Sequence, residues 1–330
     1  MPRLTLAHPV LLADQPPELA TESPYFPLGL LYLAGYVREA GHEVSIFDGT
    51  FETDESVFDA YLEEHQPDIV GISAVITTRD AALRFAARAA KYGAVVVIGG
   101  PDPTSNPAPY LCDPNVDIVV HHEGEQTIAR LLDLSVDQPL TTQRLIDEPG
   151  IALRIDGQIR VNQPRPPIEN LDELPPPARD LIDMQRYLHH WDENSGYTSI
   201  TVATGRGCPF GCQWCRDAVH GDGFRQRSPE SVAAEIKALK DAYGPESIRI
   251  VDDVDGIDQE WVESWAAAVE ELDAAIPFEP LQSSARSDLP LLEVRDSLCQ
   301  RRNKTVPTVS GDLHSPPLAA TIADESDIES

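Results

Sequence analysis

Positive charge is scarce in this sequence. Lys and Arg together number 25, against 55 Asp and Glu, and the formal net charge is −30. A negative field of this size repels nucleic acids and anionic lipids, which argues against partners of either kind. Strong surface acidity is also one way in which proteins stay hydrated at high salt. The composition therefore favours a halophilic protein, and an acidic patch for a basic partner is the alternative.

Long hydrophobic runs are missing as well. No stretch approaches the ~18 to 20 apolar residues that a membrane-spanning helix needs. The N-terminus, Met1-Pro2-Arg3 followed by a short apolar stretch, lacks the longer apolar core and the small-residue cleavage site of a signal peptide. The sequence therefore predicts a cytoplasmic protein without a membrane span.

Cysteine is also rare, with five residues in the chain of 330. Cys112 and Cys299 stand alone, whereas Cys208, Cys212 and Cys215 are close together in the sequence. An odd number of cysteines in a long chain without a secretion signal argues against a disulfide framework. The cluster instead indicates a metal site or a catalytic site.

Residues 1–135 alternate between short apolar runs and segments with helical spacing. This alternation predicts parallel strands covered by helices on both faces, that is, a doubly wound α/β domain. The loops at the carboxyl ends of its strands are the expected ligand crevice. The predicted strands are residues 3–12, 43–48, 68–75, 94–98 and 116–120, and the predicted helices are 27–40, 55–64, 80–91 and 125–134.

The remainder divides into three parts. Residues 136–195 contain a predicted hairpin at 150–162 and a proline-rich segment at 164–177, where proline removes amide donors and fixes φ, so we expect a connector. Residues 196–300 resume the α/β order, and residues 301–330 have no periodicity and are predicted to be disordered. In the second α/β part the predicted strands are 198–204, 247–251 and 278–284, and the predicted helices are 228–243 and 259–274.

The clustered cysteines form a C-x3-C-x2-C loop, Gly205-Arg-Gly-Cys-Pro-Phe-Gly-Cys-Gln-Trp-Cys215, directly after a predicted strand. Iron–sulfur clusters are held by thiolates, normally four. Three thiolates on a cubane leave one iron with an open position, which a metal centre needs in order to bind a substrate. The glycines allow the backbone to wrap closely around a cluster and to donate N–H groups to its sulfurs.

Zinc is the alternative metal for this loop. The spacing Cys212-x2-Cys215-x4-His220 matches three-quarters of a zinc knuckle, but Arg225 stands where the knuckle has its fourth ligand. Cys208 could substitute for that ligand. The net charge argues against a nucleic-acid-binding module, so a zinc-stabilised interaction module would need another partner.

At these residues the sequence resembles the radical S-adenosylmethionine (SAM) enzymes. Their signature is C-x3-C-x-Φ-C with an aromatic residue at Φ, here Trp214, and the preceding Thr204-Gly-Arg-Gly-Cys-Pro and following Phe224-Arg-Gln-Arg-Ser-Pro-Glu-Ser-Val also look like that family. The resemblance implies a partial (β/α) barrel. It further implies that Cys208, Cys212 and Cys215 bind a [4Fe–4S] cluster, that SAM chelates its open iron, and that Trp214 lies beside the adenine.

The resemblance also implies the reaction. One electron, from a donor such as ferredoxin or flavodoxin, would cleave SAM to a 5′-deoxyadenosyl radical that abstracts hydrogen from a substrate. Asp252 and Asp253 end a predicted strand where the family contacts the SAM amino group, and Arg286 ends the next. A guanidinium suits a carboxylate. The alternatives are a helix-capping turn for the aspartates and a surface ion pair for the arginine.

The first domain resembles the cobalamin-binding domain that precedes many radical SAM enzymes. The matching segments are Pro27-Leu-Gly-Leu-Leu-Tyr-Leu-Ala, Asp68-Ile-Val-Gly-Ile-Ser, Val97-Ile-Gly-Gly-Pro and Glu123-Gly-Glu125. The cobalt-ligating signature Asp-x-His-x-x-Gly is absent after the first strand, as in many members of this class. The resemblance places cobalamin near five residues at strand ends: Ser73, Gly99, Gly100, Glu123 and Gly124. The alternative for the three glycines is that they only make tight turns, as they would in any doubly wound sheet.

The pattern of the second domain ends early. The family's barrel has about six βα units, of which we find three before residue 300, so we expect a truncated catalytic domain. The leading hypothesis is a cobalamin-linked radical SAM methyltransferase or oxidoreductase that acts on an unknown small molecule or lipid. The alternative is a catalytically inactive fragment that retains the α/β binding domain.

Overall fold

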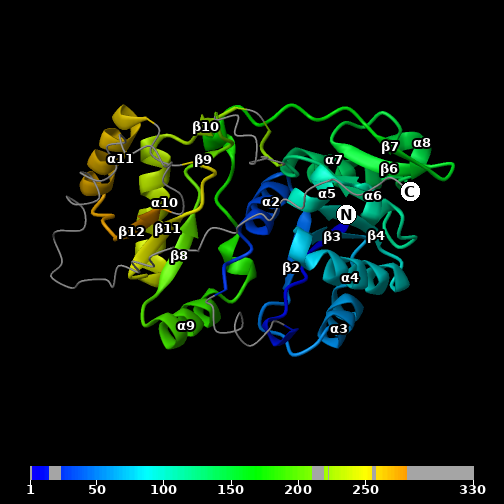
Figure 1. Cartoon of the computed structure of the whole chain (residues 1–330), viewed down its shortest axis with the longest axis horizontal. Helices are drawn as coiled ribbons and strands as arrows, with labels where there is room; N and C mark the ends of the chain where they lie inside the picture. The colour runs from blue at the N-terminus through cyan, green and yellow to red at the C-terminus, as the bar shows by residue number, and fades with distance from the viewer. Residues whose placement is uncertain (1, 15–23, 210–218, 222, 255–257, 281–330) are drawn as a thin grey trace, which may run out of the picture.

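A computed structural model of the chain describes residues 2–14, 24–209, 219–221, 223–254 and 258–280. Two α/β units lie side by side, each built on its own sheet, and helix α2 (Leu28–Glu39) lies between them (Figure 1). The expected α/β class is therefore confirmed for both units. Cys212, Trp214, Cys215, Arg286 and the tail 301–330 lie outside the described residues.

The first unit is a seven-stranded sheet with the order β2-β1-β3-β4-β5-β6-β7. Its first five strands are parallel, and the apolar runs of the sequence occupy them. The chain leaves β1 toward β2 on one side and returns to β3 on the other, so the β1/β3 boundary is the topological switch point of the sheet. The strands are β1 (Arg3–His8), β2 (Glu43–Asp48), β3 (Ile69–Ser73), β4 (Val95–Gly99), β5 (Ile118–Val120), β6 (Ile151–Ile155) and β7 (Gln158–Val161).

Helices cover both faces of this sheet, as the alternating sequence predicts. Helix α2 and α7 (Glu125–Ser135) pack on one face, in a core that includes Leu6, Val97 and Val120. Helices α3 (Ser56–His65) and α4 (Arg79–Lys91) pack on the other. Two short helices that the sequence analysis did not predict, α5 (Pro101–Ser105) and α6 (Ala108–Leu111), follow β4.

Two boundaries differ from the sequence-based expectation. The first strand was expected to reach residue 12 but ends at His8, because Pro9 has no amide hydrogen to continue the ladder. The predicted hairpin at 150–162 is present as β6 and β7, but it does not belong to a separate connector. It pairs antiparallel with β5 and so extends the first sheet beyond residue 135.

The connector packs closely on α2. A Cβ at Gly35 would lie 2.5 Å from the carbonyl oxygen of Pro176, and the amide of Ala178 donates to Leu31 O at 2.9 Å. Short turns, η3 (Leu171–Glu173) and η4 (Arg179–Leu181), interrupt the extended segment. Two further helices were not predicted: α8 (Thr142–Leu145), and α9 (Met184–Ser195), which Asp183 caps at its N-terminus and Gly196 ends in a left-handed conformation.

The second unit is a parallel sheet with the order β12-β11-β8. Ser228 caps α10 with Pro229 in the first turn, as predicted, and Gly244 ends it. Between β8 and α10 the chain forms a short antiparallel stem, β9 paired with β10, which encloses the cysteine loop. The elements are β8 (Ser199–Val202), β9 (Gly205–Arg206), β10 (Arg225–Gln226), α10 (Pro229–Tyr243), β11 (Ser247–Ile250), α11 (Gln259–Glu271) and β12 (Phe278–Pro280).

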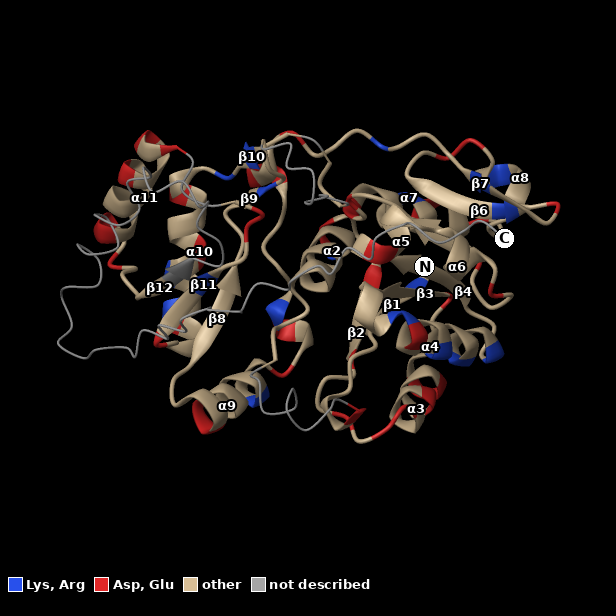
Figure 2. Ribbon diagram, viewed as in Figure 1, with Lys and Arg blue, Asp and Glu red and all other residues tan. Residues whose placement is uncertain are grey.

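Acidic residues occur on helices of both units, including α3, α9 and α11 (Figure 2). The halophilic interpretation of this acidity stays a prediction. We expect the unfolding midpoint to rise between low and molar KCl, because salt screens the repulsion among exposed carboxylates. Thermal unfolding at the two salt concentrations tests this, and a midpoint that salt leaves unchanged contradicts the halophile hypothesis.

Within the part of the chain that the structure describes, no helix is both long and apolar enough to cross a membrane.

Candidate cofactor site

A pocket of about 330 Å³ lies at the carboxyl ends of β1, β3, β4 and β5, at the switch point of the first sheet. This is where open α/β sheets bind their ligands. Apolar side chains of the sheet, such as Leu6 and Val97, line it opposite Leu30 and Leu33 of α2. The five residues predicted from the cobalamin resemblance all line this pocket: Ser73, Gly99, Gly100, Glu123 and Gly124.

Two glycines at the pocket edge have different roles. The backbone conformation requires glycine at position 100, whereas at position 99 glycine leaves space in the pocket. Gly100 has φ +118, and a Cβ there would lie 2.5 Å from the carbonyl oxygen of Ala74. Gly99, in contrast, has room for a Cβ, whose nearest neighbour would be Val120 at 3.7 Å. The absent side chain of Gly99 is therefore part of the open volume of the pocket.

Three histidines also line the pocket: His8 and His122, which the sequence analysis did not single out, and His220, which it named only in the zinc alternative. Burial lowers the pKa of His8 more than nearby Asp48 raises it, which favours the neutral imidazole. The Nδ1 atom of His8 is buried and has no hydrogen-bond partner among the described residues. His122 has φ 62, a left-handed conformation that non-glycine residues seldom adopt.

One wall of the pocket is a buried cluster of charges that joins the two units. Glu123 accepts hydrogen bonds from Arg206 at 2.9 Å and from Arg225 at 3.0 Å, and Glu125 accepts from Arg206 at 2.6 Å. These four side chains are no more than 10% exposed. Glu123 also accepts from the amide of Ile168 at 2.8 Å. The carboxylates follow β5 of the first unit, and the arginines form the paired stem of the cysteine loop.

This group of buried charges makes the stability of the fold depend on pH. Burial by itself raises the pKa of Glu123, but hydrogen bonds from Arg225, Arg206 and Ile168 together outweigh it and hold the pKa below its ordinary value of 4.5. A lowered folded-state pKa stabilises the fold above the unfolded pKa, and this contribution is lost as the pH falls through the folded value. We therefore expect Glu123→Gln to destabilise the protein most at neutral pH. Urea unfolding at about pH 7, 5 and 3.5 measures the free energy of unfolding of both proteins. The difference between the variant and the wild type should become smaller as the pH falls.

The described end of the cysteine loop is held by the two aspartates that follow β11. Asp252 accepts from the amide of Thr204 at 2.7 Å and from its hydroxyl group, and Asp253 accepts from the amide of Gly207 at 2.9 Å. Gly207 has φ +81, and a Cβ there would lie 2.0 Å from Gly223 O, so only glycine fits. The aspartates thus position the backbone immediately before Cys208, whose thiol forms no disulfide.

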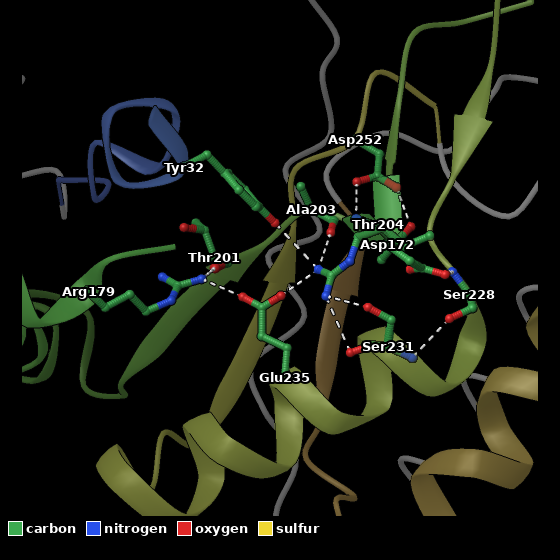
Figure 3. A network of polar contacts seen from close by, with 11 residues as sticks. Tyr32, Asp172, Arg179, Thr201, Ala203, Thr204, Ser228, Ser231, Glu235 and Asp252 are labelled. Atoms are coloured by element: carbon green, nitrogen blue, oxygen red, sulfur yellow. Dashed lines mark hydrogen bonds and ion pairs between the residues drawn. The ribbon is translucent and has the colours of Figure 1, made fainter. Parts of the chain in front are cut away.

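A second buried network fixes the other end of the stem (Figure 3). Glu235 of α10 accepts a hydrogen bond from Arg179 of the connector at 3.0 Å. It also pairs with Arg227, which follows β10. Arg227 in turn donates to Ala203 O at 3.1 Å, and Arg179 donates to Thr201 O at 2.8 Å. The connector, the end of β8 and the start of α10 are therefore joined through one carboxylate.

The predicted cluster ligands are only partly described. Cys208 is half-buried at the end of the stem, whereas Cys212 and Cys215 lie outside the described residues, as do Trp214 and Arg286. The residues that are described contain no group of three or more metal-ligating side chains. Asp252 and Asp253 do not line the pocket, so their contact with SAM stays a prediction.

The comparisons with known proteins agree with this geometry. Residues 19–132 match the family model of the B12 binding domain. An uncharacterized methyltransferase of Pyrococcus horikoshii is 36% identical over 233 residues, which cover 69% of this chain and 48% of that protein. The first unit is therefore a B12-binding domain, and the chain is a homologue of this methyltransferase. An anaerobic magnesium-protoporphyrin IX monomethyl ester cyclase of Synechocystis is 29% identical over 234 residues, covering 69% of this chain and 45% of that protein.

Solved structures share the fold of this chain. The cobalamin-dependent SAM radical enzyme OxsB, with aqua-cobalamin and SAM bound, superposes with a TM-score of 0.66 at 18% identity, covering 84% of this chain and 38% of that one. The radical SAM methyltransferase TsrM of Kitasatospora setae, with cobalamin and a [4Fe–4S] cluster bound, gives 0.62 at 18% identity, covering 82% and 52%. The chain spans about half the length of the curated relatives that it matches.

Proposed function

We propose that this chain binds cobalamin in the pocket at the β1/β3 switch point and a [4Fe–4S] cluster on the adjacent cysteine loop. Its activity would be SAM-dependent methyl transfer to, or oxidation of, an unknown small molecule or lipid. One observation carries the proposal. The B12-binding domain and the stem of the cysteine loop line the same pocket: Glu123 belongs to the domain and Arg206 to the stem. Two cofactors bound at these places would be neighbours.

The pocket residues suit an apolar part of a large cofactor. The apolar side chains between the sheet and α2 would surround its buried part, and Gly100 would allow close approach of the backbone. Val75 and Ile76, which follow β3 just beyond Ser73, are 41% and 72% exposed and offer apolar surface near the pocket. Cobalamin, when bound, supplies a cobalt centre that can carry a methyl group.

On the cysteine loop, Cys208, Cys212 and Cys215 would hold the cluster, and an external donor such as ferredoxin or flavodoxin would reduce it. The cluster, when bound, supplies the electron that cleaves SAM. Asp252 and Asp253 hold the loop backbone, and a carboxylate oxygen can accept more than one hydrogen bond, so either aspartate would also accept from the SAM amino group. Trp214 beside the adenine and Arg286 beside the SAM carboxylate complete the proposed contacts.

Two assays test this proposal on anaerobically prepared protein. Hydroxocobalamin titration followed by absorbance should give saturable binding at micromolar concentration, and dithionite with SAM should release 5′-deoxyadenosine. Cobalamin binding without 5′-deoxyadenosine would favour an inactive binding protein. One bound zinc without iron would favour a zinc-stabilised module. Absence of both cobalamin and iron from the protein would overturn the proposal.

A further inference from the structure

Among the residues that the structure describes, the stem of the cysteine loop is a two-stranded sheet of its own. β9 and β10 contribute two residues each, and their register pairs Arg206 with Arg225. Both guanidinium groups of this pair turn to the same carboxylate, Glu123, in the B12-binding domain. Arg225 also donates to Ile168 O at 2.7 Å and to His220 O at 3.2 Å. The turn that follows β5 is therefore one of the groups outside the stem that hold it, together with the aspartates after β11 and the Glu235 network.

The same turn faces the cobalamin pocket. Glu123, Gly124 and Glu125 line it, and so do Arg206 and His220 from the stem side. The guanidinium of Arg206 also lies 5.4 Å from the ring of Tyr32 on α2. A ligand in the pocket therefore contacts, on one wall, the residues that anchor the cysteine loop.

We propose that Glu123 couples the two cofactor sites, so that cobalamin in the pocket and the cluster on the cysteine loop each strengthen binding of the other. This inference rests on the proposed function. Its physical basis is a group of side chains that both sites share. Whichever cofactor binds first orders the side chains of Glu123, Arg206 and Arg225, and the second cofactor then binds next to side chains that are already ordered. Such coupling is reciprocal, so the two cofactors must change each other's affinity by the same factor.

The buried charges explain why the coupling would pass through this turn. Removing one partner of a buried ion pair leaves the other charge uncompensated. The ion pairs among these buried charges therefore form together or break together. Glu123 is the member that touches both arginines and the connector amide of Ile168. Within the described residues it is thus the group through which the pocket, the stem and the connector meet.

The test compares cobalamin affinity in two forms of the full chain. Hydroxocobalamin is titrated into protein with a reconstituted cluster and into protein from which a chelator has removed iron. For wild type we expect at least about 5-fold tighter binding with the cluster present, the lower end of typical coupling. Glu123→Gln should bring this ratio close to 1. Asp102→Asn is the matched control, because Asp102 forms a buried pair with Arg79 inside the first unit only. It should keep the wild-type ratio.

If Glu123→Gln fails to fold, the double variant Glu123→Gln/Arg225→Gln replaces it, because it removes both charges of the Glu123–Arg225 pair and leaves Arg206 its partner Glu125. Hydrogen exchange gives a second readout: cobalamin should slow exchange of the 199–209 segment in wild type and not in the double variant. Equal affinities in wild type with and without the cluster overturn the coupling and leave the proposed function intact. An undiminished ratio in the double variant also overturns it. Failure of wild type to bind either cofactor overturns both.

Discussion

A Cys208→Ala variant is expected to lose essentially all of its cluster. After anaerobic reconstitution, iron and sulfide should fall from about four of each per chain to near zero, and the broad visible absorbance of the cluster should disappear. The reason is the small number of ligands. With three thiolates available for four irons, the loss of one leaves a cubane held at two corners.

The matched control is Cys112→Ala. Cys112 is an exposed free thiol at the end of α6 in the first unit, far along the chain from the loop, so its removal should leave the iron content unchanged. Cys212→Ala and Cys215→Ala should behave as Cys208→Ala does. If Cys208→Ala retains its iron, or if zinc is found in the wild-type protein in place of iron, the cluster assignment is wrong.

Much of the fold could be predicted from local signals. The first domain has apolar runs separated by helical periods, and all five predicted parallel strands are present with boundaries within a few residues. Ser228 and Pro229 marked the start of α10 through capping chemistry, which acts within one turn. The same kind of signal was available for α9 in Asp183 and Gly196, but the proline-rich segment before it favoured the interpretation of the whole region as a connector.

The assembly of the site could not be predicted in the same way. The five strand-end residues of the pocket could be predicted because parallel strands bring their carboxyl ends to one edge. The pairing of Arg206 with Glu123 could not, since 83 positions separate them and no local pattern records the contact. Complementary charge in the two motifs, Gly205-Arg-Gly-Cys and Glu123-Gly-Glu125, was the available signal. It becomes informative only once the two units are placed side by side.

The second large effect is expected at Gly99. Side chains alternate along a strand, so position 99 faces the same way as Val97, which lines the pocket. The backbone there is ordinary β4 strand, and a Cβ would have its nearest neighbour at 3.7 Å, so a larger side chain can be accommodated only in the pocket. Gly99→Leu should therefore fold and weaken hydroxocobalamin binding at least about 100-fold, because the leucine occupies volume that the cofactor needs.

Gly99→Ala separates volume from backbone effects, since one methyl group fits at ordinary contact distance. It should cost cobalamin affinity less than about 10-fold, a difference below 1.4 kcal/mol. Thermal unfolding of both variants without ligand checks that the sheet is intact, and iron content should be unchanged because the cysteine loop is not altered. Wild-type cobalamin affinity in a folded Gly99→Leu protein would place the cofactor elsewhere. Equal losses in both variants would instead indicate that the cofactor contacts the strand-end backbone itself.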